Sequence, residues 1–171
     1  MASDAAREIL VRGARAVARA DSPTAAIETL LDTIAAQLDI ESAVIVLVDE
    51  PQGLTIAAST GLSDQAVAGL ADALRNPGHP IARTVTEPVP TFDVTPTAPG
   101  GPALRSHLPL AVTRAGTDRV LGVLALAHHR PLDEDSRRIL EAAADLAAVA
   151  VEGLRPDPTT DEGPGEGSGE V

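Results

Sequence analysis

The 171-residue chain lacks four residue types on which much protein chemistry and packing depends. It has no Cys, which excludes disulfides, zinc–thiolate sites and thiol catalysis, and no Lys, which excludes Schiff-base chemistry. It has no Trp or Tyr and only one Phe and one Met. The core must therefore be aliphatic, and a hydrophobic content of 44% is ample for one.

Long apolar runs and a basic surface are also missing. No apolar run approaches the roughly 18 residues that span a membrane. Acids and Arg alternate at the N-terminus (Asp4, Arg7, Glu8, Arg12), which is unlike a signal peptide, so we expect a cytoplasmic protein. The net charge of −12, without Lys or aromatic platforms, argues against binding to nucleic acid or to anionic membranes.

Apolar periodicity and turn signals predict an alternation of helices and strands. Ser22 before Pro23 is a well-formed helix start, and Gly53 marks a hairpin turn. The predicted helices are 3–20, 23–38, 64–74 and 133–154, with one helical turn at 81–86. The predicted strands are 42–49, 54–60, 87–94, 104–113 and 119–128. We divide the chain into an N-terminal helix (1–20), a domain (21–154) and an acidic tail (155–171) that we expect to lack stable structure.

The segment from Val120 to Leu154 carries the most information. It reads as an apolar strand, a turn with Pro131, an acidic helix start and a long Ala-rich helix. The strand shows no polar alternation up to Ala127, so both of its faces should be covered. The apolar stripe of the helix is wider than one packing partner needs, which predicts a second contact.

This segment resembles the closing strand and helix of a GAF domain, a small-molecule-sensing module. The likeness lies in Gly122–Leu126, the Pro turn, the acidic start at Asp133 and the small-residue run before Glu152. Two more segments resemble strands of that family and occur in the same order along the chain: 87–94 (EPVPTFDV) and 104–110 (LRSHLPL). The resemblance implies an α+β fold, with a central antiparallel sheet of about five strands in the order 2-1-5-4-3 between helices on both faces.

The resemblance and the residues together suggest a ligand pocket. Strand alternation places His107 on one face with Arg105, opposite Leu108, and a mixed Arg and His face suggests a polar-lined cavity. Arg83, Phe92 and Asp93 are the other candidates, since Arg can hold a carboxylate or phosphate bidentately. Simpler interpretations also exist. His107 could be a half-buried residue whose hydrogen bonds are satisfied within the protein, the Arg residues could form ion pairs at the surface, and Phe92 could pack in the core.

No metal or cofactor is expected. Adjacent His128 and His129 at a strand end point to opposite faces, and Asp133 with Asp135 suit a helix start. Relatives that hold haem do so through a His before the 104–110 strand, where residues 99–102 have none. The longer polar signature of cyclic-nucleotide-binding relatives is also missing.

The sequence favours a non-enzymatic sensory or regulatory module for an unknown small molecule. The alternative is a ligand-free GAF-fold scaffold for dimerisation and protein–protein interaction, and an enzyme ranks third. We expect a homodimer formed by the N- and C-terminal helices, because a lone helix at 3–20 needs a partner surface. Ile9 and Ala16 would face its core beside Ala143 or Ala150. Output would pass through that dimer or a separate signalling protein.

Overall fold

A computed structural model describes residues 2–49, 53–96 and 104–153. Its centre is one antiparallel sheet of five strands in the order β2-β1-β5-β4-β3, as predicted. The strands are β1 (Ile40–Asp49), β2 (Gly53–Thr60), β3 (Thr91–Val94), β4 (Leu104–Arg114) and β5 (Thr117–His128). The last strand in sequence therefore occupies the middle of the sheet, where it pairs with both β1 and β4.

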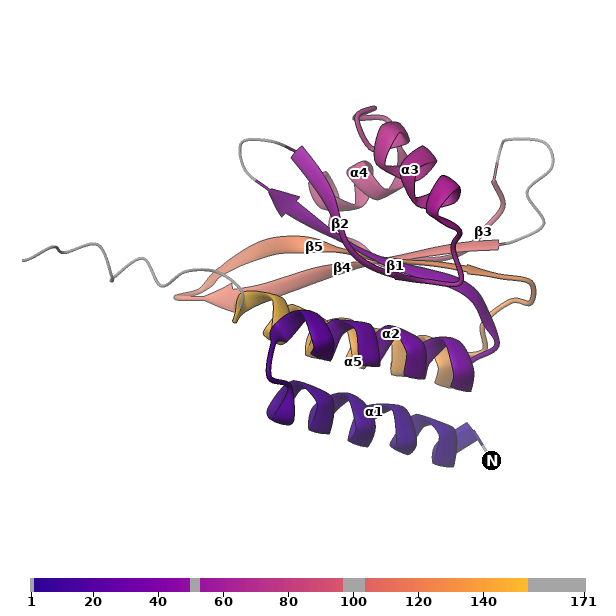
Figure 1. Cartoon of the computed structure of the whole chain (residues 1–171), viewed down its shortest axis with the longest axis vertical. Helices are drawn as coiled ribbons and strands as arrows, with labels where there is room; N and C mark the ends of the chain where they lie inside the picture. The colour runs from indigo at the N-terminus through magenta and orange to yellow at the C-terminus, as the bar shows by residue number, and fades with distance from the viewer. Residues whose placement is uncertain (1, 50–52, 97–103, 154–171) are drawn as a thin grey trace, which may run out of the picture.

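Helices cover both faces of this sheet (Figure 1). On one face lie α1 (Ala2–Arg19), α2 (Pro23–Gln37) and α5 (Glu134–Glu152). On the other lie the two short helices α3 (Asp64–Ala73) and α4 (Pro80–Thr86). Helices α2 and α5, the second and the last in sequence, thus lie side by side on the same face. No helix of the described residues is long and apolar enough to cross a membrane.

The helix starts follow local sequence rules. Ser22 accepts a hydrogen bond from the backbone N–H of Ala25 at 3.2 Å, and Asp133 accepts one from Ser136 at 2.7 Å. Each bond satisfies a donor that the first helical turn leaves without a partner. The hydrogen bonds from Ser136 lower the pKa of Asp133. These caps explain why both helix starts were predictable from sequence alone.

Two aliphatic cores lie on either side of the sheet. The larger one fills the space beneath α1, α2 and α5, and the smaller one joins β1 and β5 to α3 and α4 through Val46, Val123 and Ile81. Residues 121–128 of β5 are all buried, which confirms that both faces of this strand are covered. Gly122 is required here, because a Cβ atom would lie 2.1 Å from the carbonyl oxygen of Val46 in β1.

Helix α1 packs against α2 and α5 of its own chain. Ile9 is fully buried, and a Cβ atom on Gly13 would lie 2.9 Å from Leu30 Cδ1 and 3.2 Å from Leu146 Cδ1. The premise that α1 needs a second subunit is therefore wrong, although dimerisation itself stays a prediction. Ala143 is 0% exposed within one chain, so it packs inside the core of its own domain.

Some element boundaries differ from the predicted ones. The expected single turn at 81–86 is a two-turn helix that begins at Pro80, because His79 caps it and accepts a hydrogen bond from Ile81 N–H. The edge strand is shorter than 87–94 and begins at Thr91, after the two prolines that cannot donate to a ladder. The predicted tail, 155–171, lies outside the described residues.

Candidate functional site

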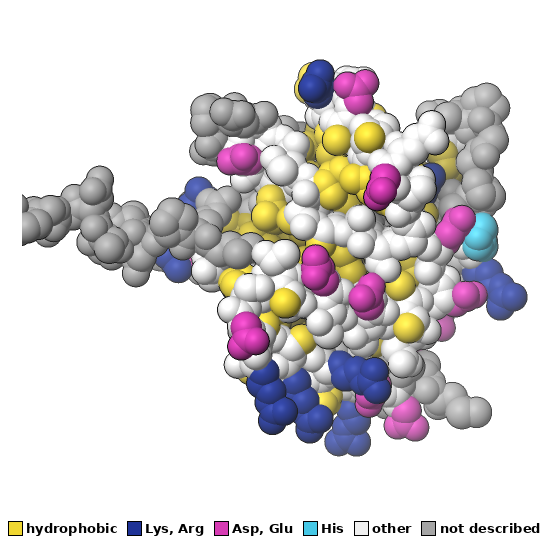
Figure 2. Space-filling model, in the orientation of Figure 1, with side chains coloured by type: hydrophobic (Ala, Val, Ile, Leu, Met, Phe, Trp, Pro, Cys, Tyr) yellow, Lys and Arg dark blue, Asp and Glu magenta, His cyan; other side chains and the backbone are white. Residues whose placement is uncertain are grey.

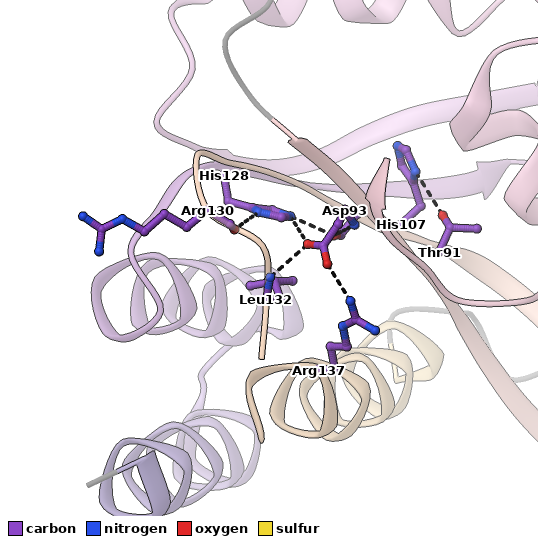
Figure 3. Close-up of polar contacts among 8 residues, drawn as sticks. Thr91, Asp93, His107, His128, Arg130, Leu132 and Arg137 are labelled. Carbon is purple, nitrogen blue, oxygen red and sulfur yellow. Dashed lines mark hydrogen bonds and ion pairs between the residues drawn. The ribbon is translucent and has the colours of Figure 1, made fainter. Parts of the chain in front are cut away.

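The five pocket residues predicted from sequence fall into separate groups. Arg105 and His107 share the face of β4 that carries α4, whereas Phe92 and Asp93 of β3 face α5 on the other side. Figure 3 shows His107 and Asp93 pointing to these opposite sides. Arg83 lies on α4 and is exposed. Arg105 and His107 therefore lie on the same face of the sheet, as predicted from alternation, and Phe92 and Asp93 lie on the opposite face.

A bulge in β3 explains why two consecutive residues face the same helix. Thr91 pairs with His107 and Val94 with Arg105, so the register shifts between them, and Asp93 has a φ of 55°. Asp tolerates this left-handed conformation better than most residues. In a regular strand Phe92 and Asp93 would point to opposite faces. The bulge turns both toward α5, which alternation counting could not foresee.

Asp93 links the edge strand to the β5–α5 connection and to α5. Its Oδ1 accepts the backbone N–H of Leu132 at 2.9 Å, and its Oδ2 lies 2.5 Å from Nη2 of Arg137. The Arg137 guanidinium also lies over the Phe92 ring, 5.1 Å from its centroid. These contacts hold β3 against the helical layer, so the role of Asp93 in this structure is architectural.

A buried Ser–His pair lies beside Asp93. Nδ1 of His128 lies 2.7 Å from the Arg130 carbonyl, which can only accept, so Nδ1 carries the proton. Nε2 then accepts from the Ser106 hydroxyl at 2.8 Å, and Ser106 Oγ accepts from Asp93 N–H at 3.2 Å. Ser106 is 0% exposed, so the pair cannot reach a substrate and is no catalytic dyad.

A basic cluster lies on the opposite face of β4, and we define it as Arg105, His107 and His79. His107 is 6% exposed, and its Nδ1 lies 3.4 Å from Thr91 Oγ1. Burial, then the charges of His79 and Arg105, lower the pKa of His107 to about 4. Burial also lowers the pKa of His79. Sequence analysis missed His79, because only the fold brings the start of α4 over β4.

A separate, mostly apolar cavity of about 660 Å³, partly open to solvent, lies between the β1–β2 hairpin and helices α3 and α4. Aliphatic side chains dominate its wall, and apolar side chains also reach the surface over α3 and β2 (Figure 2). The lining residues are Val48, Gly53, Leu54, Ala71, Leu74, Arg75, Pro77, Ala82, Val85 and Thr86. None of the five predicted pocket residues is among them. No local motif marks this wall, because its residues come from separate segments.

The described residues contain no group of three or more His, Asp or Glu side chains that could hold a metal ion. The basic cluster supplies only two imidazoles and an Arg, and a cation would be repelled by the Arg. Two kinds of binding contact are available at these places: apolar contact in the cavity, and charge-assisted hydrogen bonding at the basic cluster.

Comparison with solved structures agrees on the fold. The chain is similar to the GAF domain of a phosphoenolpyruvate-protein phosphotransferase from Coxiella burnetii, with 15% identity, 88% of this chain and 94% of that chain covered, and a TM-score of 0.71. It is also similar to the GAF domain of a protein assigned as a sensor histidine kinase from Pseudomonas syringae pv. tomato (20% identity, 90% and 91% covered, TM-score 0.62).

A third similar structure is the free methionine-R-sulfoxide reductase from Neisseria meningitidis, with 15% identity, 86% and 88% covered, and a TM-score of 0.65. No curated protein matches the chain. At these identities the structures establish the fold alone. The sequence family described as GAF domain matches residues 20–152, which is most of the chain. This match shows that the chain belongs to the GAF domain family, and the five-stranded sheet in the order β2-β1-β5-β4-β3 agrees with it.

Proposed function

We propose that this protein is a sensory module that binds a small apolar molecule in the cavity beneath α3 and α4. The observation that carries the proposal is the cavity itself. Its volume of about 660 Å³ falls within the range of roughly 300–1,000 Å³ that is usual for ligand pockets.

The chemistry of the wall limits the ligand class. Leu54, Leu74 and Val85 are aliphatic, and among the lining residues only Arg75 is charged. Arg75 pairs with Asp72 at 3.6 Å through largely exposed side chains, so it is a rim residue and no buried anchor. A neutral or weakly polar molecule therefore fits the wall better than a nucleotide, whose phosphates would need several buried donors.

We infer that the module has no enzymatic role of its own. The chain has no Cys, and the Ser106–His128 pair is sealed inside the core. Binding could reach a partner through the helical layer, where Val149 on α5 is 58% exposed and Val11 on α1 is 39% exposed. These side chains are suitable contacts for a second subunit or a signalling protein, and homodimerisation remains part of the proposal.

Filling the cavity should abolish binding of an apolar probe. We expect the neutral dye N-phenyl-1-naphthylamine to bind the wild-type protein saturably, with a rise in dye fluorescence. Val85→Trp places an indole in the cavity and should weaken dye binding by about tenfold or more, which corresponds to at least ~1.4 kcal/mol. The measurement is a fluorescence titration of both proteins.

The matched control is Val89→Trp, four residues further on, where the native side chain is 63% exposed and does not line the cavity. This variant should bind the dye like the wild type. Because the natural chain has no Trp, indole emission also reports whether each new side chain is buried. Equal dye affinity in the two variants would exclude the cavity as the binding site.

A further inference from the structure

The outer side of α1, which faces away from α2 and α5, takes no part in the proposed binding of an apolar molecule. It carries four exposed side chains, which we call the Arg face: Arg7, Arg12, Arg15 and Arg19. The last three follow one another at three and four residues, the spacing of neighbours on a helix surface. Figure 2 shows Arg side chains gathered along the lower edge of the molecule, over α1.

The charge of this helix contrasts with that of the rest of the chain. Four Arg against two acids give residues 1–20 a net charge of +2, so the remaining residues carry −14. Arg12 pairs with Glu8 on the same helix, whereas Arg7, Arg15 and Arg19 form no ion pair with any residue in 2–49, 53–96 and 104–153. The Arg face therefore presents positive charge that the described part of the protein does not neutralise.

The chain supplies an acidic segment of its own. Residues 155–171, the acidic tail, contain five acids and one Arg, which gives them a net charge of −4. The acids are spread along the whole segment: Asp157, Asp161, Glu162, Glu166 and Glu170. Apart from prolines, its only aliphatic side chain is that of Val171. Charge, and not apolar burial, is therefore what could attach this segment to a surface.

The acidic tail begins beside one end of the Arg face. Helices α1 and α5 lie side by side and run in the same direction (Figure 1). They meet at Gly13, where a Cβ atom would lie 3.2 Å from Leu146 Cδ1. The same number of residues further along each helix brings Arg19 level with Glu152, because both helices rise equally per residue. The end of α5, from which the tail continues, is thus close to Arg19.

The tail is also long enough to follow α1 back to its start. An extended chain covers about 3.3 Å per residue, so residues 154–171 can reach roughly 60 Å. Helix α1 has 18 residues and is about 27 Å long. A segment that leaves the end of α5 can therefore pass along the whole Arg face of its own chain.

We propose that the acidic tail lies along α1 and pairs with the Arg face of the same chain. Each exposed ion pair contributes little by itself, but the covalent connection keeps the acids at a high effective concentration near the Arg side chains. The pairing needs no fixed conformation of the tail. It supplies the negative charge that the described residues do not provide.

A docked tail would regulate access to the helical layer. Val11 lies between Arg7 and Arg15 on the same side of α1 and is 39% exposed. It is one of the apolar contacts suggested above for a second subunit or a signalling protein, and this consequence alone rests on the proposed function. The tail would cover Val11, so a partner would have to displace it before binding to α1.

The test places a nitroxide spin label on Ser168→Cys in the full chain, where the new Cys is the only one. Amide resonances near the label broaden, and reduction of the nitroxide gives the reference spectrum. We expect broadening of residues 7–19 but not of α3, which lies on the other face of the sheet. The broadening should disappear between about 0.01 M and about 1 M sodium chloride, since the Debye length falls from roughly 30 Å to roughly 3 Å.

Two double variants of the labelled chain test the Arg face. Arg15→Gln with Arg19→Gln should reduce the broadening of α1 by about threefold or more, the effect of losing two exposed ion pairs. The matched control is Arg83→Gln with Arg130→Gln, two exposed positions outside α1 that also form no ion pair with the described residues. It removes the same charge and should leave the broadening unchanged.

A third variant leaves the folded domain untouched and should abolish the broadening by neutralising the tail: Asp157→Asn, Asp161→Asn, Glu162→Gln, Glu166→Gln and Glu170→Gln. A mixture of ¹⁵N-labelled chains without the nitroxide and unlabelled chains with it shows whether the tail reaches a second copy. The proposal is overturned if α1 is not broadened, if the broadening survives high salt or the neutral tail, if both double variants behave alike, or if the mixture is broadened as strongly as the single chain. None of these outcomes bears on the apolar cavity, which lies on the other face of the sheet.

Discussion

Ile9→Ala should destabilise the whole domain by about 2–5 kcal/mol, the usual cost of truncating a buried Ile. Ile9 is fully buried within one chain, in the larger core with residues of α2 and α5. Its loss leaves a cavity between α1 and these two helices. Urea unfolding followed by far-UV circular dichroism measures the effect, since the chain has no Trp to report by fluorescence.

Val11→Ala is the matched control two residues along the same helix. Val11 is 39% exposed, so the change should alter the free energy of unfolding by at most about 0.5 kcal/mol. Both measurements are made at two protein concentrations with light scattering alongside. If α1 packs on its own domain, the loss in Ile9→Ala is independent of concentration. A negligible loss, or one that appears only where the protein is dimeric, would show that α1 packs on a second subunit instead.

Asp93→Ala should cost about 2–5 kcal/mol of stability, the sum of two effects. The change leaves the N–H of the buried Leu132 without its acceptor and Arg137 without its carboxylate, which costs about 1–3 kcal/mol. It also places Ala at a φ of 55°, which costs roughly 1–2 kcal/mol more. We expect β3 to detach first, and amide hydrogen exchange of residues 91–94 should report this.

Asp93→Asn separates the two causes. Asn keeps an acceptor for Leu132 N–H and tolerates the left-handed conformation, so it loses only the charge that pairs with Arg137. Because Arg137 is 43% exposed, that loss should be small, about 1 kcal/mol or less. If the Asn variant is as unstable as the Ala variant, the ion pair and not the backbone contact holds the edge strand.

Much of this fold could be predicted from sequence because the signals are local. Ser22 and Asp133 cap helices through bonds that span three residues, and the apolar run up to Ala127 predicts a strand with two covered faces. Alternation also placed Arg105 and His107 together on one face of β4. The sheet order rested on the ordered likeness to the GAF family, because strand spacing alone does not fix which strands pair.

The candidate sites depend on contacts between distant segments, and only the tertiary structure decided them. Alternation along β3 would point the Asp93 side chain toward α4. The bulge at Asp93 turns it toward α5 instead, because one extra residue in a strand moves the side chains that follow it to the opposite face. His79 acts on His107 because α4 packs over β4, and helix α1 packs against α2 and α5. No local sequence pattern predicts either contact. The sequence by itself determined which segments become helices and strands, through capping and periodicity. The cavity, the cluster and the sealed Ser106–His128 pair were decided by how those elements pack, since each is built from residues that are neighbours only in space.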